Sequence, residues 1–287
     1  MILGEDRVSV IRNIKQNAES GAFHDKVELT DPVLSAAQSR DITDTYIAHR
    51  RRVSFRMKSA LGVAVANIAT RIINKDTVIE GLEKLPSDLR GVIITSNHFG
   101  PLENTVIRHL TKTLGRRRLG IISQTSNFAM TGFIGFLMNY ADTIPISTDT
   151  RYLARDLLTV LKERLVDRGD AILLYPEQEM WFNYRKPRPP KNGAYFYAAK
   201  LNVPIVSCFV EMTDTNADDT PEFKKVRYTL HVLDVLYPDA ALTARENTER
   251  LAQQDYALKV ACYERVYGKP LSYAFESSDI AGWKGSL

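Results

Sequence analysis

A histidine and a glutamate stand five residues apart where an apolar run ends, and their spacing suits acid–base chemistry. His98 and Glu103 follow residues 91–96, whose sequence Gly-Val-Ile-Ile-Thr-Ser is typical of a buried strand. Pro101 suits the first position of a helix, so we expect His98 on the loop after the strand and Glu103 in the first helical turn. A carboxylate that accepts one ring N–H leaves the other nitrogen of His98 able to take a proton from a substrate. The alternatives are a structural histidine and a glutamate that only caps its helix.

Residues 175–180, Tyr-Pro-Glu-Gln-Glu-Met, form a second polar cluster after the apolar run 171–174. A further apolar segment, Val-Pro-Ile-Val at 203–206, comes after a helix-like segment that begins at residues 191–193. Strands that alternate with helices predict a mostly parallel sheet, and such sheets bind ligands at the carboxyl ends of their strands. We therefore expect both polar clusters to face one site.

These segments resemble, in order, the sequence blocks of the glycerolipid acyltransferase family, which includes the lysophosphatidate acyltransferases. The first block, Asn-His followed by four residues and an acid, is matched by Asn97, His98 and Glu103, with Glu in place of the usual Asp. The third block, Phe-Pro-Glu-Gly-Thr-Arg, is similar to residues 175–180, and Val203–Val206 resembles the fourth. The resemblance implies that His98 and Glu103 are catalytic, and that an acyl group passes from acyl-CoA or acyl carrier protein to a hydroxyl of a lipid acceptor.

Two departures from the family pattern concern positive charge. The second block normally ends in an arginine, but here residues 141–147 carry only its apolar part, and the nearest arginine comes later. The arginine of the third block is replaced by Met180, which removes a cation expected to meet a phosphate. The basic, proline-rich segment 184–191, which includes Arg185, offers replacements. The predicted substrate-binding set is Asn97, Arg151, Pro176, Glu177, Gln178, Lys186, Arg188 and Lys191.

Length and composition predict one catalytic domain with helical additions. A chain of 287 residues with 44% hydrophobic residues can bury a substantial core. We expect an α/β fold whose mostly parallel central sheet is flanked by helices. The predicted parts are a helical region at 1–77, a catalytic domain at 78–240, and a C-terminal helix and tail at 241–287. The two cysteines predict no disulfide framework, and the scattered histidines predict neither a metal site nor a resident cofactor.

Residues 50–75 combine basic residues with an apolar run and predict contact with a membrane surface. The segment has seven Lys or Arg and no acid, and its apolar run at 60–69 is too short to cross a hydrocarbon core of ~30 Å. A helix in the interface would turn basic side chains to anionic head groups, and the predicted contacts are Arg50, Arg51, Arg52 and Arg56. The alternative is a core-docked helix with a solvated basic end. Because residues 1–50 lack a secretory signal, we expect a cytoplasmic protein held peripherally at the inner face of the membrane.

Three other functions stay open from the sequence. A catalytically silent, lipid-associated scaffold would explain the altered third block, and a thioester hydrolase would use the same dyad with water in place of the acceptor. Nucleic-acid binding is suggested by the pI of about 8.9 and by the aromatic and basic residues of 181–186. A net charge of only +4, spread over mixed charges, argues against it. The predicted partners are therefore a lipid acceptor, an acyl donor and a membrane surface, and no nucleic acid.

Overall fold

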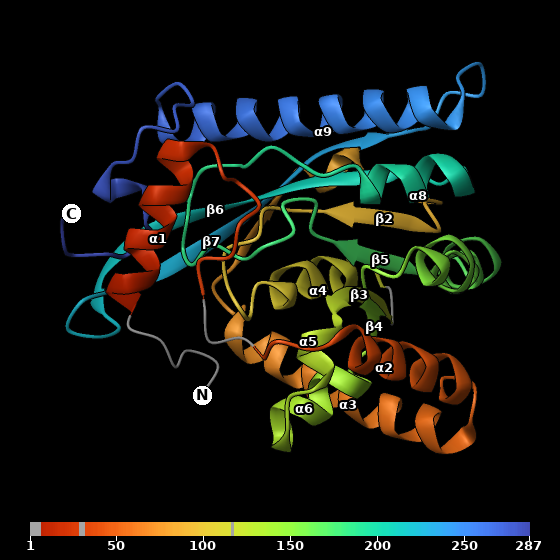
Figure 1. Cartoon of the computed structure of the whole chain (residues 1–287). Coiled ribbons are helices and arrows are strands. Elements are labelled where there is room, and N and C mark those ends of the chain that lie inside the picture. Colours follow the sequence, from red (N-terminus) through yellow and green to blue (C-terminus); the bar gives the residue numbers. More distant parts are fainter. Residues whose placement is uncertain (1–6, 29–31, 116–117) are drawn as a thin grey trace.

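The computed structural model describes residues 7–28, 32–115 and 118–287, and a seven-stranded sheet forms its centre (Figure 1). The strand order is β1-β7-β6-β2-β5-β3-β4, and all neighbours are parallel except β6 and β7, which form an antiparallel hairpin. The strands are β1 Val78–Glu80, β2 Val92–Thr95, β3 Leu119–Gln124, β4 Thr143–Ile146, β5 Ala171–Leu174, β6 Ile205–Asp218 and β7 Lys224–Leu236. The predicted α/β fold with a mostly parallel sheet is confirmed.

Helices cover both faces of this sheet and its β4 edge (Figure 1). One helix, Tyr152–Asp167, has α7 at Leu158–Lys162 in its middle and π-type turns at both ends. The other helices are α1 Arg7–Ser20, α2 Ala36–His49, α3 Val53–Ile73, α4 Asn104–Thr113, α5 Thr125–Phe128, α6 Gly132–Tyr140, α8 Gly193–Leu201 and α9 Ala244–Tyr267. The predicted C-terminal helix is therefore present as α9.

The central strands are apolar on both faces because each face packs against helices. Ile93 and Ile172 point to one face, where they join a core with side chains from the α7 helix, α8 and α9. Val92 and Ile94 point to the opposite face, where α4 supplies Val106 and its neighbours. This alternation along one strand explains why the apolar runs of the sequence show no polar side. Helices packed on both faces of the sheet thereby fix the carboxyl ends of β2, β5 and β3.

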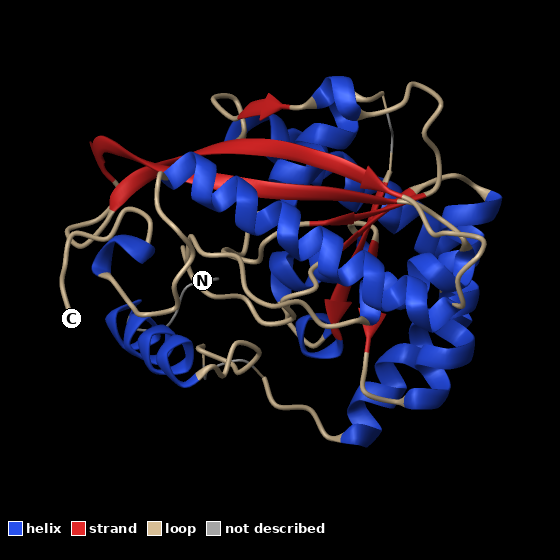
Figure 2. Ribbon diagram, turned by 90° about the horizontal axis from the view of Figure 1, so that it is seen from above, coloured by secondary structure: helices blue, strands red, loops and turns tan. Residues whose placement is uncertain are grey.

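The C-terminal helix α9 lies along the β6–β7 hairpin and also packs against α8 (Figure 2). The helix begins with a capping box, in which the Thr243 side chain accepts from the Glu246 N–H and the Glu246 carboxylate accepts from Thr243. In its middle, Asp255 accepts from the Tyr195 hydroxyl of α8 and from the Thr95 hydroxyl of β2. These buried bonds connect α9 to the strand that leads into the His98 loop.

The N-terminal helices α2 and α3 lie together with α5 and α6 beside β4, away from α9 (Figure 1). One side of α3 packs on α4 and α6, where Gly62 brings its backbone against the Tyr140 carbonyl. The other side exposes large apolar side chains, Val53, Met57, Leu61, Ile68 and Ile72, and α6 adds Phe133. Within the described residues, no helix is both long and apolar enough to cross a membrane.

Candidate active site

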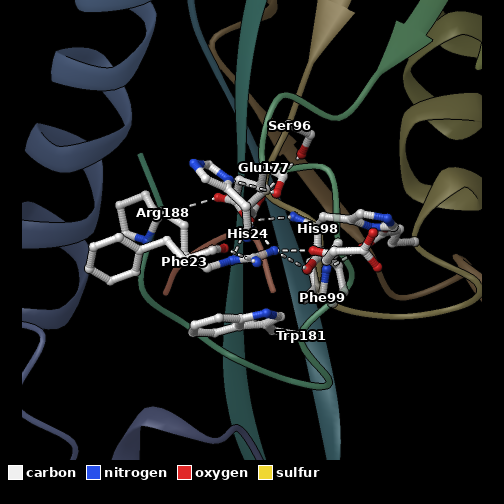
Figure 3. Close-up of polar contacts among 12 residues, drawn as sticks. Phe23, His24, Ser96, His98, Phe99, Glu177, Trp181 and Arg188 are labelled. Atoms are coloured by element: carbon white, nitrogen blue, oxygen red, sulfur yellow. Dashed lines mark hydrogen bonds and ion pairs between the residues drawn. The ribbon is translucent and has the colours of Figure 1, made fainter. Parts of the chain in front are cut away.

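His98, which Figure 3 shows, meets Glu103 just after the carboxyl end of β2. The Nδ1 atom of His98 contacts the Glu103 Oε1 atom, and because a carboxylate only accepts, Nδ1 carries the proton. Glu103 is almost fully buried, whereas the His98 side chain is 20% exposed. Among the described residues, none hydrogen-bonds to Nε2 of His98. The arrangement leaves Nε2 able to accept a proton from a group that approaches the loop.

Glu103 organises the His98 loop and does not lie inside the following helix. Its Oε2 atom accepts the main-chain N–H groups of Phe99 and, at 2.8 Å, of Gly100. The prediction of a helix that begins at Pro101 was wrong, since α4 begins at Asn104 and residues 101–103 form a turn. The physical reason is that the Glu103 carboxylate accepts the N–H groups of Phe99 and Gly100. These side-chain bonds stabilise a turn at residues 101–103 in place of a first helical turn.

The segment after β5 runs alongside this loop and supports it through the main chain. Glu177 Oε2 accepts the His98 N–H at 3.2 Å, and the Trp181 N–H donates to the His98 carbonyl at 3.1 Å. The Asn183 N–H donates to the Phe99 carbonyl at 2.8 Å. The two polar clusters of the sequence are thus brought together, and each of these contacts involves a main-chain group of residue 98 or 99.

Glu177 is itself held by a buried arginine. The Arg188 guanidinium lies 2.9 Å from Glu177 Oε2, and the Arg188 N–H donates to Oε1 at 3.0 Å. The Arg188 side chain is completely buried, and its guanidinium stacks over the Trp181 ring at 4.4 Å. Burial lowers the pKa of Arg188, although the Glu177 charge opposes this. Figure 3 shows the guanidinium directed at Glu177 and at the carbonyl of His98.

The remaining predicted block residues also lie at this edge of the sheet. Asn97 is buried and pairs with the β6 main chain, donating to the Val210 carbonyl and accepting from the Val210 N–H. Pro176 is buried, and its carbonyl accepts from the Lys191 N–H at 2.8 Å. Gln178 is exposed and has a left-handed backbone with φ 66°, at the position where the family block has Gly. Of these residues, Gln178 presents its side chain to solvent.

The candidate basic side chains differ in whether they are paired within the protein or open to a ligand. Lys186 is buried and donates to Asp279 at 2.6 Å, and Arg185 pairs with Asp214. Lys191 is exposed, and its side chain has no partner among the described residues. Arg151 is exposed but follows β4, which lies three places from β2 in the sheet, or about 14 Å at strand spacing. Lys191 is therefore the predicted cation that is both at the site and open to a ligand.

The N-terminal segment after α1 reaches the same site, which the sequence did not indicate. The Phe23 carbonyl accepts from Arg188 at 2.8 Å, and the Asp25 carbonyl accepts from the Trp181 indole at 3.1 Å. His24 Nδ1 lies 3.4 Å from the Glu177 carbonyl (Figure 3). Burial, and then the charges of Lys191 and Arg188, lower the pKa of His24, although the bond to Glu177 opposes the shift. A lone histidine 153 positions from its partner gives no signal that sequence reasoning could use.

The basic residues predicted to contact a membrane fall into two groups. Arg50 lies 2.8 Å and Arg51 3.0 Å from Glu163, so both are paired within the protein. Arg52 and Arg56 are exposed at the start of α3, next to its apolar side. Across the described parts of the chain, no three His, Cys, Asp or Glu side chains are grouped in a way that could hold a metal ion.

Comparisons with known proteins identify the family. The sequence model of the Acyltransferase family matches residues 76–211, which contain the His98 loop and the whole 175–191 segment. Residues 76–211 belong to the acyltransferase family. No curated protein matches the sequence significantly. The predicted family is confirmed by this match.

The fold of the chain is similar to that of a solved protein. The crystal structure of PlsC, the 1-acyl-sn-glycerophosphate (LPA) acyltransferase of Thermotoga maritima, matches with a TM-score of 0.52 and 16% identity. The match covers 82% of this chain and 99% of that chain. At this identity the likeness is one of fold, and the acyltransferase fold extends over helices outside residues 76–211.

Proposed function

We propose that the protein transfers an acyl group from a thioester, acyl-CoA or acyl carrier protein, to a hydroxyl of a lipid acceptor. The observation that carries the proposal is the pairing of His98 Nδ1 with buried Glu103, which leaves Nε2 open. The fold shared with PlsC, a 1-acyl-sn-glycerophosphate acyltransferase, supports a phospholipid-related acceptor. The predicted use of a general base is consistent with both.

In the proposed mechanism, His98 and Glu103 are the catalytic pair. The acceptor hydroxyl gives its proton to Nε2 as its oxygen attacks the thioester carbonyl carbon. The tetrahedral intermediate then expels the thiolate, which takes the proton from the imidazolium. Glu103 keeps the proton on Nδ1 and stabilises the imidazolium that forms, and such general-base assistance contributes about 10²–10⁴ in rate.

The acceptor site is proposed to lie where Gln178, Lys191 and His24 surround the Glu177 main chain. Lys191 and His24 are close enough for the lysine charge to lower the pKa of His24. Lys191 would then supply the positive charge that Met180 removes from the third block. Asn97, Pro176, Glu177, Lys186 and Arg188 would act on the substrate through the shape of the loop, since their polar groups are bound within the protein.

The protein is proposed to work as a peripheral protein on the inner face of the membrane. The exposed apolar side of α3, together with Arg52 and Arg56 at its start, fits a helix that lies in the head-group region. Lipid substrates partition into the bilayer, so attachment there raises their local concentration at the catalytic loop.

The test is incubation of the purified protein with labelled acyl-CoA, or labelled acyl carrier protein, and a total lipid extract. We expect a labelled acyl lipid that mass spectrometry identifies, and His98→Ala should abolish it. Tyr237→Phe, a change at an exposed position directly after β7, serves as a folded control. Release of free fatty acid without any acyl lipid would reject transfer and favour a thioester hydrolase. No turnover of either donor would favour a silent scaffold.

A further inference from the structure

Tyr175 contacts the dyad although the proposed chemistry assigns it no part. It stands where the third family block usually has Phe, so its hydroxyl is an addition to the pattern. The register of β2 and β5 pairs Thr95 with Leu174, which places Tyr175 beside the start of the His98 loop. The Tyr175 and His98 rings are stacked, with centroids 4.2 Å apart and planes inclined by only 7°. Such a contact restricts how the imidazole can rotate.

The Tyr175 hydroxyl is a buried donor that faces an acid. Its oxygen is buried and, among the described residues, has no hydrogen-bond partner at an ordinary distance. Burial first, and then the neighbouring Glu103 charge, raises the pKa of Tyr175 well above its ordinary value. The phenol therefore keeps its proton and offers it toward the carboxylate. Because an unpaired buried donor is costly, a bond to Glu103 is favourable.

The other ionisable groups around the dyad do not compete for this role. The carboxylate of Glu177 accepts the His98 N–H, and Arg188 balances its charge. On the β7 side, the Tyr228 ring packs on Phe99 at 5.3 Å. Burial, and then Glu103 and Asp219, raise the pKa of Tyr228 to about 12, so it is also neutral. Tyr175 is a neutral donor that stacks on His98 and lies near enough to Glu103 for the carboxylate charge to raise its pKa.

We propose that Tyr175 is a positioning residue, whose ring fixes the plane of the His98 imidazole and whose hydroxyl donates to the Glu103 carboxylate. The proposal rests on the general-base role of His98 proposed above. A bond to Glu103 draws negative charge away from the oxygen that binds Nδ1, so the carboxylate stabilises the imidazolium less. Removing the hydroxyl should therefore strengthen the interaction of the carboxylate with the imidazolium, whereas neutral imidazole is the form that can accept a proton.

Two variants separate the ring from the hydroxyl. Tyr175→Phe removes only the hydroxyl and restores the residue usual in the family, whereas Tyr175→Leu also removes the stacked ring. Tyr184→Phe is the matched control, because the Tyr184 hydroxyl is likewise buried without a partner in the described part of the chain but lies near Asp279, not Glu103. Thermal unfolding of each variant shows whether it is folded.

The measurement is an NMR titration of the His98 ring signals, assigned with His98→Ala and recorded without substrate. In Tyr175→Phe we expect the midpoint of the His98 titration to rise by about half a pH unit or more. The acid limb of kcat/KM should move in the same direction, and Tyr184→Phe should change neither. In Tyr175→Leu we also expect kcat to fall about tenfold or more, because the imidazole is less well oriented.

The outcomes distinguish this proposal from the proposed function. An unmoved His98 titration in folded Tyr175→Phe would overturn the role of the hydroxyl. An unchanged kcat in Tyr175→Leu would overturn the role of the ring. If Tyr175→Phe moves the titration but the wild-type protein transfers no acyl group, the contact with the dyad is upheld and acyl transfer is rejected.

Discussion

Arg188 and Glu177 form a buried ion pair that holds the His98 loop through the main chain of His98. The guanidinium lies 2.9 Å from the same carboxylate oxygen that accepts the His98 N–H at 3.2 Å. Arg188 also donates to the carbonyl of Phe23, so one side chain joins the N-terminal segment to the third block. The pair therefore stabilises the site without offering its charge to a substrate.

We expect Arg188→Met to destabilise the protein by about 3–5 kcal/mol, because it leaves the Glu177 carboxylate buried without a counter-charge. Denaturant unfolding measures the loss. Arg245→Met is the matched control, since Arg245 pairs with Glu249 on the exposed face of α9 and such pairs contribute little. Equal stability of the two variants would contradict this account of the buried pair. The double variant Arg188→Met/Glu177→Gln should recover part of the loss, because it removes both charges.

Glu103→Gln should lower kcat by about 10²–10⁴. Both carboxylate oxygens of Glu103 accept from N–H groups, namely those of His98, Phe99 and Gly100. A glutamine has a single acceptor oxygen, so its NH₂ group must face one of these donors. The loss should appear in kcat at saturating acyl donor, whereas the KM for the donor stays nearly unchanged. A variant with wild-type kcat would show that Glu103 serves the loop alone.

The left-handed backbone at Gln178 predicts a graded effect of substitution. With φ at 66°, a β-branched side chain clashes with its own backbone, whereas Gly has no such restriction. We expect Gln178→Val to destabilise the protein by about 1–2 kcal/mol and Gln178→Gly to leave stability nearly unchanged. Thermal unfolding distinguishes them. Gln253→Val on the exposed side of α9 is the control for the loss of a glutamine at a surface position.

Much of the fold could be predicted because its signals are local. The apolar runs before His98 and before Tyr175 are β2 and β5, and both polar clusters lie at the carboxyl ends of these strands. The roles of individual cations could not be predicted in this way. In the sequence, Lys186 and Arg188 belong to a basic segment that is typical of a solvated loop. In the structure both side chains are buried in ion pairs, with Asp279 and Glu177 respectively. Their partners lie 93 and 11 positions away, and charge pattern alone does not indicate which acids come close.

The start of α4 and the N-terminal segment show the same limit. Pro101 is compatible both with the first turn of a helix and with a separate turn that precedes the helix. The hydrogen bonds that Glu103 accepts from the loop N–H groups favour the separate turn. His24 reaches Glu177 only because Trp181 and Arg188 bind the main chain on either side of it. Such contacts depend on tertiary packing, which a local pattern does not encode.

Glu163 should make the stability of the protein depend on pH in the acidic range. Burial alone would raise its pKa, but hydrogen bonds from Arg50 and Arg51, and the charges of Arg50 and Arg168, hold the pKa at about 2. The folded protein therefore binds this proton less readily than the unfolded chain, whose glutamate has a pKa of about 4.5. The stabilisation is complete above that value and is lost as the pH falls toward 2. Glu163→Gln should cost about 1–2 kcal/mol at pH 7, allowing for solvent screening.

Denaturant unfolding of wild type and Glu163→Gln between pH 2 and 7 measures this effect. The difference between the two proteins should shrink as the pH falls below about 4.5 and nearly vanish at pH 2. Glu249→Gln, which alters an exposed pair on α9, should show a much smaller difference throughout. A difference that stays constant with pH would contradict the ion-pair explanation and indicate a packing defect.

The exposed apolar side of α3 should bind lipid vesicles. Substitution of its apolar residues and of the nearby arginines should affect this binding in different ways. Leu61→Glu/Ile68→Glu places charges on side chains that are 58% and 60% exposed, so the fold should tolerate them. We expect this variant to lose binding to neutral and anionic vesicles alike, because it removes the buried apolar area. Arg52→Gln/Arg56→Gln should weaken binding to anionic vesicles alone, by about fivefold per charge at low salt.

Co-sedimentation with vesicles of phosphatidylcholine, with and without phosphatidylserine, measures both effects. Val33→Glu is the matched control, since Val33 is 95% exposed but lies before α2, outside the apolar side of α3. Arg50→Gln should have little effect on binding because Arg50 is paired with Glu163. Because salt screens charges but not apolar contacts, high salt should reproduce the Arg52→Gln/Arg56→Gln result in the wild-type protein. Unchanged binding in Leu61→Glu/Ile68→Glu would exclude α3 as the membrane-contacting surface.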